Sequence, residues 1–466
     1  MLRNYFKIAF RNLLKQKAFS AINLFGLTVG LVSVLLIALY LFDELTSDRF
    51  HKNAEDIYRI VETKTSPEGK ETKVVSVAAN IATKLKNDYP EVANATRFSM
   101  FGRVNVANTE NRAVFYESYY MADSSFFSVF DFPQVAGDLK AALTEPYSVV
   151  LTDETAKKIF GNTAAVGRTL NTEGDSTPYK ITGVISIPKN SHLQFNLLFS
   201  ESSLYSLPQF AQTFTADWSS NNFVTYVQLK NKTAVQTAGA INQFVKANRE
   251  DNGTTKSSFV LQPLKDIHFG SAGLEGSTET SGNITHVYVF GIVAFFVLLI
   301  ACINYMNLTT ARFAGRSKEI AVRKVAGASQ KNLIKQFLTE ASLLTLVALV
   351  LALGIVKLAL PRFNTFTEKN LHLGFGTDYR IWLMVLLTAV FVGIAAGLYP
   401  AFYQSRLKPY ALLKNKVAAG KGNLSVRRML VVFQFSLSII MIVATVVVYQ
   451  QMKYVDSTDM GFNKQQ

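Results

Sequence analysis

Long stretches of the sequence contain no charged residue, and they limit the folds open to this chain more than any other feature. Four of them run for 24 or 25 residues without an Asp, Glu, Lys or Arg. About 20 apolar residues in a helix cross the ~30 Å core of a bilayer, and a helix satisfies its own backbone there. A fifth stretch is charged only at Glu340 and Lys357, near its ends, where charges can reach the headgroups. We therefore predict about five transmembrane helices, over residues 18–42, 287–311, 336–360, 381–405 and 429–452.

The chain begins with a basic segment in which apolar residues recur at helical spacing. Residues 1–17 are therefore predicted to form a cytoplasmic amphipathic helix on the membrane surface, with a solvated basic leader as the alternative. A secretory signal fits less well, because a signal core has ~7 to 15 apolar residues and residues 18–42 form a run of 25. We interpret that run as an uncleaved anchor. The repeated positions are Leu2, Phe6, Phe10 and Leu13, with Arg3, Lys7, Arg11 and Lys15 between them.

The net charge of +15 is concentrated in the segments that flank the predicted spans. Residues 1–17 carry five Lys or Arg, and residues 312–335 and 403–428 carry seven each, with Glu319 as the single acid in all three. Because basic loops are retained in the cytoplasm, these segments are predicted to face inward. Residues 43–285 carry 23 basic and 27 acidic residues and are predicted to lie outside. Positive charge that belongs to membrane-flanking loops argues against nucleic-acid binding.

The predicted outer segment mixes short β-type runs with helical patterns. Such a mixture predicts a large α+β extracytoplasmic domain, in two lobes, with a boundary or loop in the Ser-, Thr-, Gln- and Asn-rich residues 204–222. The single cysteine, Cys302, lies in a predicted span, so the domain must be held by its own core rather than by disulfides. Strands are predicted at residues 56–62, 148–152, 179–185 and 223–229, and helices at 81–88 and 234–248.

The sequence contains no pattern typical of an enzyme active site. Residues 161–169 superficially resemble a phosphate loop, but five residues separate the glycines and an Arg stands where a Lys is needed. The five His show no metal-ligand spacing, and neither a metalloprotease helix nor a nucleophile elbow occurs. We therefore expect a structural turn at 161–169, no metal or cofactor bound by this chain, and no enzymatic activity of its own.

The loop between the second and third predicted spans has the most specific pattern. As a helix, it places Arg316, Glu319 and Arg323 on one face, with the Glu four residues before the Arg in the order that favours an ion pair. Gly327 can end this helix, and Ser329 can cap the helix that follows. The residues alone leave two interpretations open: an exposed helix in a basic cytoplasmic loop, or a docking element for a cytoplasmic partner.

The run Arg-Ser-Lys-Glu-Ile-Ala-Val-Arg-Lys-Val-Ala-Gly-Ala-Ser at residues 316–329 resembles the signature loop of FtsX-like permease domains in MacB-type ABC transporters. Ala-Gly-Leu-Tyr-Pro-Ala at 396–401, with Lys408-Pro409, resembles the end of their last span. The outer segment resembles the MacB-like periplasmic core domain in several short stretches. These are Phe160-Gly161, Val166-Gly167, Gly183-Val184 and Pro-Lys-Asn-Ser-His at 188–192.

This resemblance implies a permease subunit in a bacterial inner (plasma) membrane. A separate cytoplasmic ABC ATPase would use the ATP, since no Walker motif is present. Other expected partners are the lipid bilayer, a second permease half or dimer mate, and a periplasmic adaptor. The implied function is export or extraction of a substrate; the alternative is a signalling permease that regulates an extracytoplasmic partner such as a cell-wall hydrolase. The implied ATPase-docking residues are Arg316, Lys318, Glu319, Arg323, Lys324 and Gly327.

The resemblance also implies a domain order. A family unit has four spans, so the fifth span and the end at Gln466 predict the N-terminal half of a duplicated, Bacteroidetes-type permease, with a natural five-span protein as the alternative. The predicted parts are an amphipathic helix (1–17), span one (18–42), a MacB-like periplasmic core domain (43–285), an FtsX-like permease domain with spans two to four (286–405), a cytoplasmic linker (406–428), span five (429–452) and the start of a second outer segment (453–466).

Overall fold

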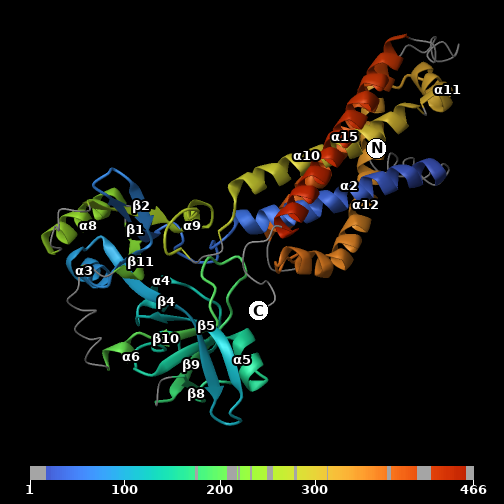
Figure 1. Cartoon of the computed structure of the whole chain (residues 1–466). Helices are drawn as coiled ribbons and strands as arrows, with labels where there is room; N and C mark the ends of the chain where they lie inside the picture. The colour runs from blue at the N-terminus through green and yellow to red at the C-terminus, as the bar shows by residue number, and fades with distance from the viewer. Residues whose placement is uncertain are drawn as a thin grey trace. The chain divides into compact units, whose positions relative to one another are not determined.

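The computed structural model describes residues 17–173, 177–206, 218, 221–230, 234–248, 256–277, 281–311, 313–374, 379–406 and 421–457. The chain forms two compact units: an α+β unit, Asp43–Ile284, and a helical unit made of the chain before and after it (Figure 1). Some predicted features lie wholly or mostly outside the described residues. They are the amphipathic helix at 1–17, Lys408-Pro409, and the segments 204–222, 406–428 and 453–466.

Five helices in the described part of the helical unit are long and apolar enough to cross a membrane, which confirms the number predicted from the charge-free stretches. A shorter helix, α11 (Phe313–Val325), lies between the second and third of them in the chain. The five are α2 (Lys17–Leu45), α10 (Ile284–Ala311), α12 (Gln330–Thr367), α13 (Tyr379–Arg406) and α15 (Lys421–Ser457).

Helices α2 and α10 pack closely because two glycines of α2 face α10. Gly26 and Gly30 are four residues apart and lie on one helix face. A Cβ on Gly30 would come within 2.7 Å of the Ala301 Cβ, and one on Gly26 within 3.1 Å of the Asn304 side chain. Small residues at this spacing let membrane helices approach closely. The contact defines an antiparallel register, with Gly30 opposite Ala301 and Gly26 opposite Asn304.

Helices α12 and α13 also pack closely through glycines that face small residues of the neighbouring helix. A Cβ on Gly397 would come within 2.8 Å of the Ala341 Cβ, and one on Gly393 within 3.3 Å of the Ser342 side chain. Small-residue contacts therefore join the helices in two pairs. The pairs share one apolar core, to which α2 contributes Leu31 and Leu35, α10 Cys302 and Tyr305, α12 Ala348 and Ala352, and α13 Val385 and Val392.

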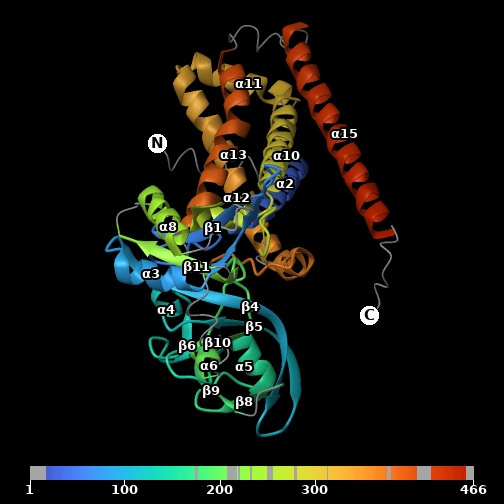
Figure 2. The same cartoon turned by 60° about the vertical axis from the view of Figure 1, so that its left-hand side comes forward.

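Helix α15 differs from the other four. Only 6% of its apolar window is buried, against 33–44% in the others, and it stands clear of them in Figure 2. Its apolar stretch, residues 429–452, contains no glycine. The close glycine contacts that join the other two pairs therefore have no counterpart in this stretch.

The described part of the α+β unit contains a mixed 12-stranded sheet in the order β12-β1-β11-β4-β5-β10-β7-β9-β6, with β2, β3 and β8 beside this path. The four predicted strands and two predicted helices are present as β1, β7, β9, β11, α3 and α8. The strands are β1 (Ile57–Thr65), β2 (Glu71–Val74), β3 (Ser76–Ala78), β4 (Val92–Asn108), β5 (Val114–Ala122), β6 (Gln134–Gly137), β7 (Ser148–Thr152), β8 (Thr169–Thr172), β9 (Tyr179–Ile185), β10 (Leu197–Ser200), β11 (Asn221–Leu229) and β12 (Lys256–Pro263). The helices are α3 (Asn80–Asp88), α4 (Phe126–Val129), α5 (Asp153–Phe160), α6 (Ser202–Tyr205), α8 (Ala234–Asn248) and α9 (Leu264–Gly270).

Strand β4 is the longest strand described in this sheet and pairs with different neighbours along its length. Its first part pairs with β11 and the rest with β5, and the register shifts between Met100 and Gly102, where a positive φ of 89° suits glycine. One apolar cluster of this unit contains Ile60 and Ile81, and another contains Val149 and Ile181. A third cluster is rich in aromatic rings, including Phe98, Phe126, Phe130, Phe195 and Tyr226.

Candidate functional site

The predicted docking residues lie on α11 and in the turn after it. Arg316 and Lys318 belong to α11, but their side chains lie outside the described part of the structure. Glu319 and Arg323 form the ion pair that their spacing predicted, with 2.6 Å between Oε1 and Nη2. Arg323 Nη1 also donates a hydrogen bond of 2.7 Å to Gln336 Oε1 on α12. Arg323 therefore connects α11 to α12 through Gln336, and it also places a partly exposed positive charge on α11.

Lys324 ties α11 to α13 in the same way. Its Nζ donates a hydrogen bond of 2.6 Å to the backbone oxygen of Ser405, in the last turn of α13. A cation at the C-terminal end of a helix is favoured by the free carbonyls there. Partial burial lowers the pKa of Lys324 below its usual value. Gln330 Nε2 donates to Ser405 Oγ at 3.4 Å, so α12 also contacts this turn.

The apolar side chains in the described part of α11 divide into a buried and an exposed set. Ile320 and Ala321 are buried against Leu333 and Phe337 of α12 and Ala401 of α13. Val322 and Val325 are 62% and 72% exposed. Helix α11, which follows α10 in the chain (Figure 2), is thus fixed to the ends of two spanning helices by its buried residues. Val322 and Val325 remain exposed on the same helix as the Glu319–Arg323 pair.

The turn from α11 to α12 is built as the sequence predicted. Gly327 has a φ of 93°, and its N–H and that of Ala328 donate to the carbonyls of Lys324 and Arg323. Ser329 is the N-cap of α12, and its side chain accepts a hydrogen bond from the N–H of Asn332. Both ends of the turn satisfy helix-terminal groups that would otherwise be unpaired, so the angle between α11 and α12 is well defined.

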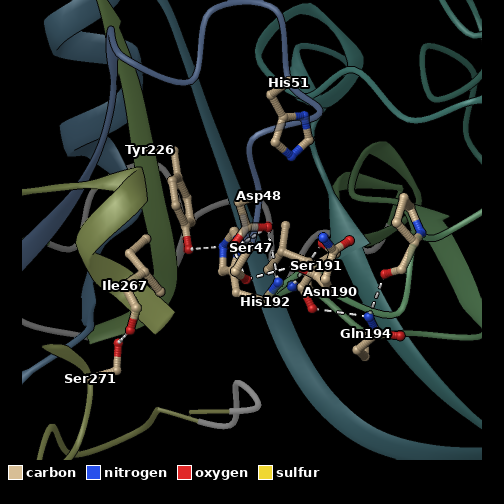
Figure 3. Close-up of polar contacts among 12 residues, drawn as sticks. Ser47, Asp48, His51, Asn190, Ser191, His192, Gln194, Tyr226, Ile267 and Ser271 are labelled. Carbon is tan, nitrogen blue, oxygen red and sulfur yellow. Dashed lines mark hydrogen bonds and ion pairs between the residues drawn. The ribbon is translucent and has the colours of Figure 1, made fainter. Parts of the chain in front are cut away.

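A second polar cluster lies in the α+β unit, directly after the end of α2 (Figure 3). Ser47 Oγ and the Asp48 N–H both donate to the carbonyl of Asn190, at 2.7 and 3.1 Å. Asp48 Oδ1 accepts from the His192 N–H at 3.0 Å and lies 2.9 Å from His192 Nδ1. His192 Nε2 is 2.8 Å from the Tyr226 hydroxyl on β11. The chain that leaves α2 is therefore linked through Asp48 and His192 to the middle of the sheet.

This cluster is buried, and its surroundings lower the pKa values of Asp48 and of the nearby His51. Burial alone would raise the pKa of Asp48, but the charge of His192 and the hydrogen bonds from it hold that pKa below its usual value. Burial lowers the pKa of nearby His51 to about 4, and its Nδ1 accepts a hydrogen bond from the Asp131 N–H, as a neutral imidazole can.

An Asp, a His and a Tyr in line could suggest a catalytic relay, but the surroundings favour a structural role. His192 is 1% exposed and Tyr226 0%, and the Tyr226 ring packs against Phe98 and Phe130. A substrate has no access to such a group. Among the described residues, no group of three or more His, Cys, Asp or Glu could hold a metal ion. Gly161 ends α5 in the left-handed conformation, so the loop at 161–169 begins as the structural turn that was predicted.

Two features of this architecture were missed from the sequence. The four-residue glycine spacing of α2 and α13 is a known signal for close helix packing and could have been read directly. The contact of Asp48 with His192 joins residues 144 positions apart. No local pattern in the sequence points to that pairing.

Two parts of the chain are similar in sequence to known protein domains. Residues 20–243 match the MacB-like periplasmic core domain, and residues 291–409 match the FtsX-like permease C-terminal domain. The chain belongs to the MacB/FtsX-like ABC transporter permeases. The FtsX-like match covers α11 and the described parts of α12 and α13, and it ends before α15. This permease thus carries an extracytoplasmic domain and membrane-spanning helices in a single chain.

Several known transporter proteins are similar in sequence to this permease. The uncharacterized ABC transporter permease YvrN of Bacillus subtilis is 21% identical over 88% of this chain and 99% of its own length. The macrolide export ATP-binding/permease protein MacB of Pasteurella multocida is 26% identical over 57% of this chain, and that of Aggregatibacter actinomycetemcomitans is 30% identical over 43%. The chain spans 38% and 28% of the length of these two MacB proteins.

Solved structures of single domains are similar to part of this chain. A domain of a putative permease from Porphyromonas gingivalis is 19% identical, with a TM-score of 0.41, over 46% of this chain and 91% of its own. The extracellular domain of the transporter YknZ is 13% identical, with a TM-score of 0.33, over 44% of this chain and 99% of its own.

Proposed function

We propose that this chain is a permease subunit that couples ATP hydrolysis by a separate cytoplasmic ABC ATPase to movement of its extracytoplasmic α+β unit. The movement exports or extracts a substrate on the outer side of a bacterial inner membrane. The basic segments that flank the spans support an orientation with the N-terminus and α11 inside and the α+β unit outside.

The arrangement of α11 carries this proposal. Its exposed Val322 and Val325 form a small apolar surface beside charged side chains, which is the composition of many protein interfaces. Its buried side is joined to α12 through Arg323 and to α13 through Lys324. A partner that moves the exposed side therefore acts on the ends of two spanning helices together.

The polar cluster after α2 supports the outer half of the proposal. Asp48 follows α2 by three residues and is bonded to the loop at His192, which in turn contacts Tyr226 in the sheet. A buried network of this kind resists deformation, because each lost hydrogen bond leaves a buried polar group unpaired. A displacement of this end of α2 is thus passed to the sheet rather than absorbed by a loose linker.

In this arrangement the partner ATPase binds and hydrolyses ATP, and this chain has no nucleotide site of its own. Paired ATPase domains act on two permease halves, so a second half or a second copy of the chain completes the assembly. A periplasmic adaptor is a further proposed partner of the α+β unit.

The test is co-purification of the tagged full-length chain with its candidate ABC ATPase in detergent. Wild type is compared with a variant carrying Val322→Asp and Val325→Asp. A matched control is Val114→Asp in the α+β unit, because Val114 is 63% exposed and Val322 is 62% exposed. We expect the double variant to insert normally and lose the ATPase, while the control keeps it. ATPase binding by the double variant would remove α11 as the docking surface, and failure of wild type to bind an ABC ATPase would contradict the proposed function.

A further inference from the structure

A second polar contact, separate from the Asp48 cluster, lies where the chain enters and leaves the α+β unit. Glu44 belongs to the last turn of α2, and His268 belongs to α9. Glu44 Oε2 and His268 Nε2 are 2.7 Å apart, and the two side chains are 8% and 10% exposed. A hydrogen bond between a carboxylate and an imidazole at this depth is stronger than a surface pair, since solvent screens it less.

The segment that leaves the unit packs on the same two side chains. Gly282 lies two residues before the start of α10, and its N–H donates a hydrogen bond of 2.8 Å to the carbonyl of His268. A Cβ at this position would come within 2.4 Å of His268 Nε2 and 2.8 Å of Glu44 Oε2. A Cβ there would force the end of one or both side chains to shift, so the present approach of the three residues requires glycine.

Helix α9 is itself anchored to the sheet. Arg59 on β1 is 0% exposed, and its Nη2 donates to Gln262 Oε1 at 2.7 Å and to Ser271 Oγ at 2.8 Å. Ser271 follows α9 directly, and its hydroxyl donates to the Ile267 carbonyl at 2.6 Å. A buried guanidinium with two hydrogen bonds holds its partners in a fixed geometry. The residue that meets Glu44 and Gly282 thus stands on an element bonded to the central sheet.

We propose that Glu44, His268 and Gly282, here called the base clamp, hold the entering and leaving segments together so that α2 and α10 act on the α+β unit as one element. This inference rests on the proposed function, because it names residues that transmit the proposed movement. Without the base clamp, the entering and leaving segments move independently of each other, and the movement of α2 and α10 is not transmitted to the α+β unit. These are positioning residues, and their loss spares ATP hydrolysis by the partner.

Three variants probe the base clamp. Gly282→Ala drives a methyl group between Glu44 and His268, and His268→Ala removes one member of the pair. Glu44→Gln keeps a hydrogen-bonding side chain of the same length and is the conservative variant. Gly239→Ala on α8 is the matched glycine control, because a Cβ there meets nothing within 4 Å.

The readout is a nucleotide-dependent distance in the full-length chain bound to its ATPase. Cys302 is replaced by alanine, and nitroxides are attached to cysteines introduced at Val135 on β6 and Phe366 in the last turn of α12, which are 45% and 86% exposed. The distance distribution is measured without nucleotide and with ATP and vanadate. ATP hydrolysis and thermal unfolding are measured on the same samples, because a purely structural defect changes the unfolding temperature without selectively removing the distance change.

We expect Gly282→Ala and His268→Ala to keep ATPase binding and ATP hydrolysis while showing about half of the wild-type distance change or less. Glu44→Gln and Gly239→Ala keep the full change. A full change in both Gly282→Ala and His268→Ala would overturn the base clamp and leave the proposed function intact. A wild type that hydrolyses ATP with no distance change would contradict the proposed function itself.

A charge exchange keeps the proposal testable if Gly282→Ala does not fold. His268→Glu alone sets two carboxylates against each other and should remove the distance change, whereas Glu44→His combined with His268→Glu restores the pair and should recover it. Failure of the exchanged pair to recover the change, in a folded protein that binds its ATPase, would count against the base clamp.

Discussion

The junction at α11 and the cluster that follows α2 are both polar, but they are built in opposite ways. Glu319 and Arg323 are paired with 45% and 33% of their side chains exposed. Asp48 and His192 are paired with 1% and 0% exposed. Exposed pairs contribute about 0–1 kcal/mol, whereas removing one partner of a buried pair costs about 3–5 kcal/mol. The contrast suggests that α11 is built for exchangeable contact with a partner and the Asp48 cluster for permanent attachment.

The largest expected effect is that of Asp48→Ala. The substitution leaves the His192 side chain and N–H without their acceptor in a buried site, and alanine is strained at the φ of 58° that Asp48 adopts. We expect the free energy of unfolding to fall by about 3–5 kcal/mol, seen as a lower unfolding temperature of the full-length chain in detergent. Asp48→Asn retains one acceptor and tolerates the positive φ, so it should cost clearly less. Equal losses in the two variants would show that the contact with His192 is not the source.

Packing between α2 and α10 is expected to be the next most sensitive feature. Gly30→Ala places a methyl group 2.7 Å from the Ala301 Cβ, and such overpacking costs about 1–3 kcal/mol. Gly291→Ala on α10 is the matched control, because a Cβ there meets nothing within 4 Å. Thermal unfolding of both variants in one detergent checks the difference. If Gly30→Ala were as stable as Gly291→Ala, the close approach of these helices would not matter to stability.

The buried histidine next to Asp48 predicts a dependence on pH. Burial lowers the pKa of His51 from 6.5 to about 4, so the unfolded chain takes up a proton in this range that the folded chain refuses. Stability from this group is complete above about pH 6.5 and is lost as the pH falls toward about 4, amounting to about 2 kcal/mol by about pH 5. His51→Phe should reduce the loss of stability between about pH 7.5 and 5 by that amount. An unchanged loss would mean that another group causes it.

Asp123 opposes this trend and serves as an internal check. Burial, together with the charge of Glu201, raises its pKa to about 6. The folded chain therefore binds a proton more readily than the unfolded chain, and this contribution increases stability as the pH falls through about 6 toward 3.8. Asp123→Asn removes that gain, so its stability should fall more steeply with acid than that of wild type. A shallower dependence in Asp123→Asn would reverse the assigned direction.

The smallest effect on stability is expected at α11. Glu319→Ala removes an exposed ion pair and should change the free energy of unfolding by less than about 1 kcal/mol. Reversing both charges, with Glu319→Arg and Arg323→Glu, also breaks the hydrogen bond from Arg323 to Gln336. That double variant should lose most of the co-purifying ATPase while its unfolding temperature stays close to that of wild type. A loss of stability as large as that of Asp48→Ala would erase the contrast between the two junctions.

Much of the fold could be predicted from local sequence patterns. The charge-free stretches predicted five spans, and alternation of apolar residues located β1, β7, β9 and β11. The four-residue spacing of Glu319 and Arg323, and the residue types at Gly327 and Ser329, predicted the local structure around α11. These features depend on neighbours a few positions apart in the chain, and such neighbours are visible in the sequence.

The contacts that join distant segments could not be predicted. Lys324 meets Ser405 across 81 positions, and Glu44 meets His268 across 224. The pairing of these polar residues depends on how the helices and the sheet pack. No local pattern in the sequence indicates that pairing. The exposure of Val322 likewise became clear only once its neighbours Ile320 and Ala321 were seen to be buried against α12 and α13.

The central claim is that a partner bound at α11 changes the α+β unit when it uses ATP. Amide hydrogen exchange of the full-length chain with its ATPase, with and without ATP and vanadate, tests this most directly. We predict that exchange changes in residues 43–48 and 281–284 while β7 stays protected, and that the change disappears in the Val322→Asp, Val325→Asp variant. Identical exchange with and without nucleotide, in a complex that hydrolyses ATP, would contradict the account.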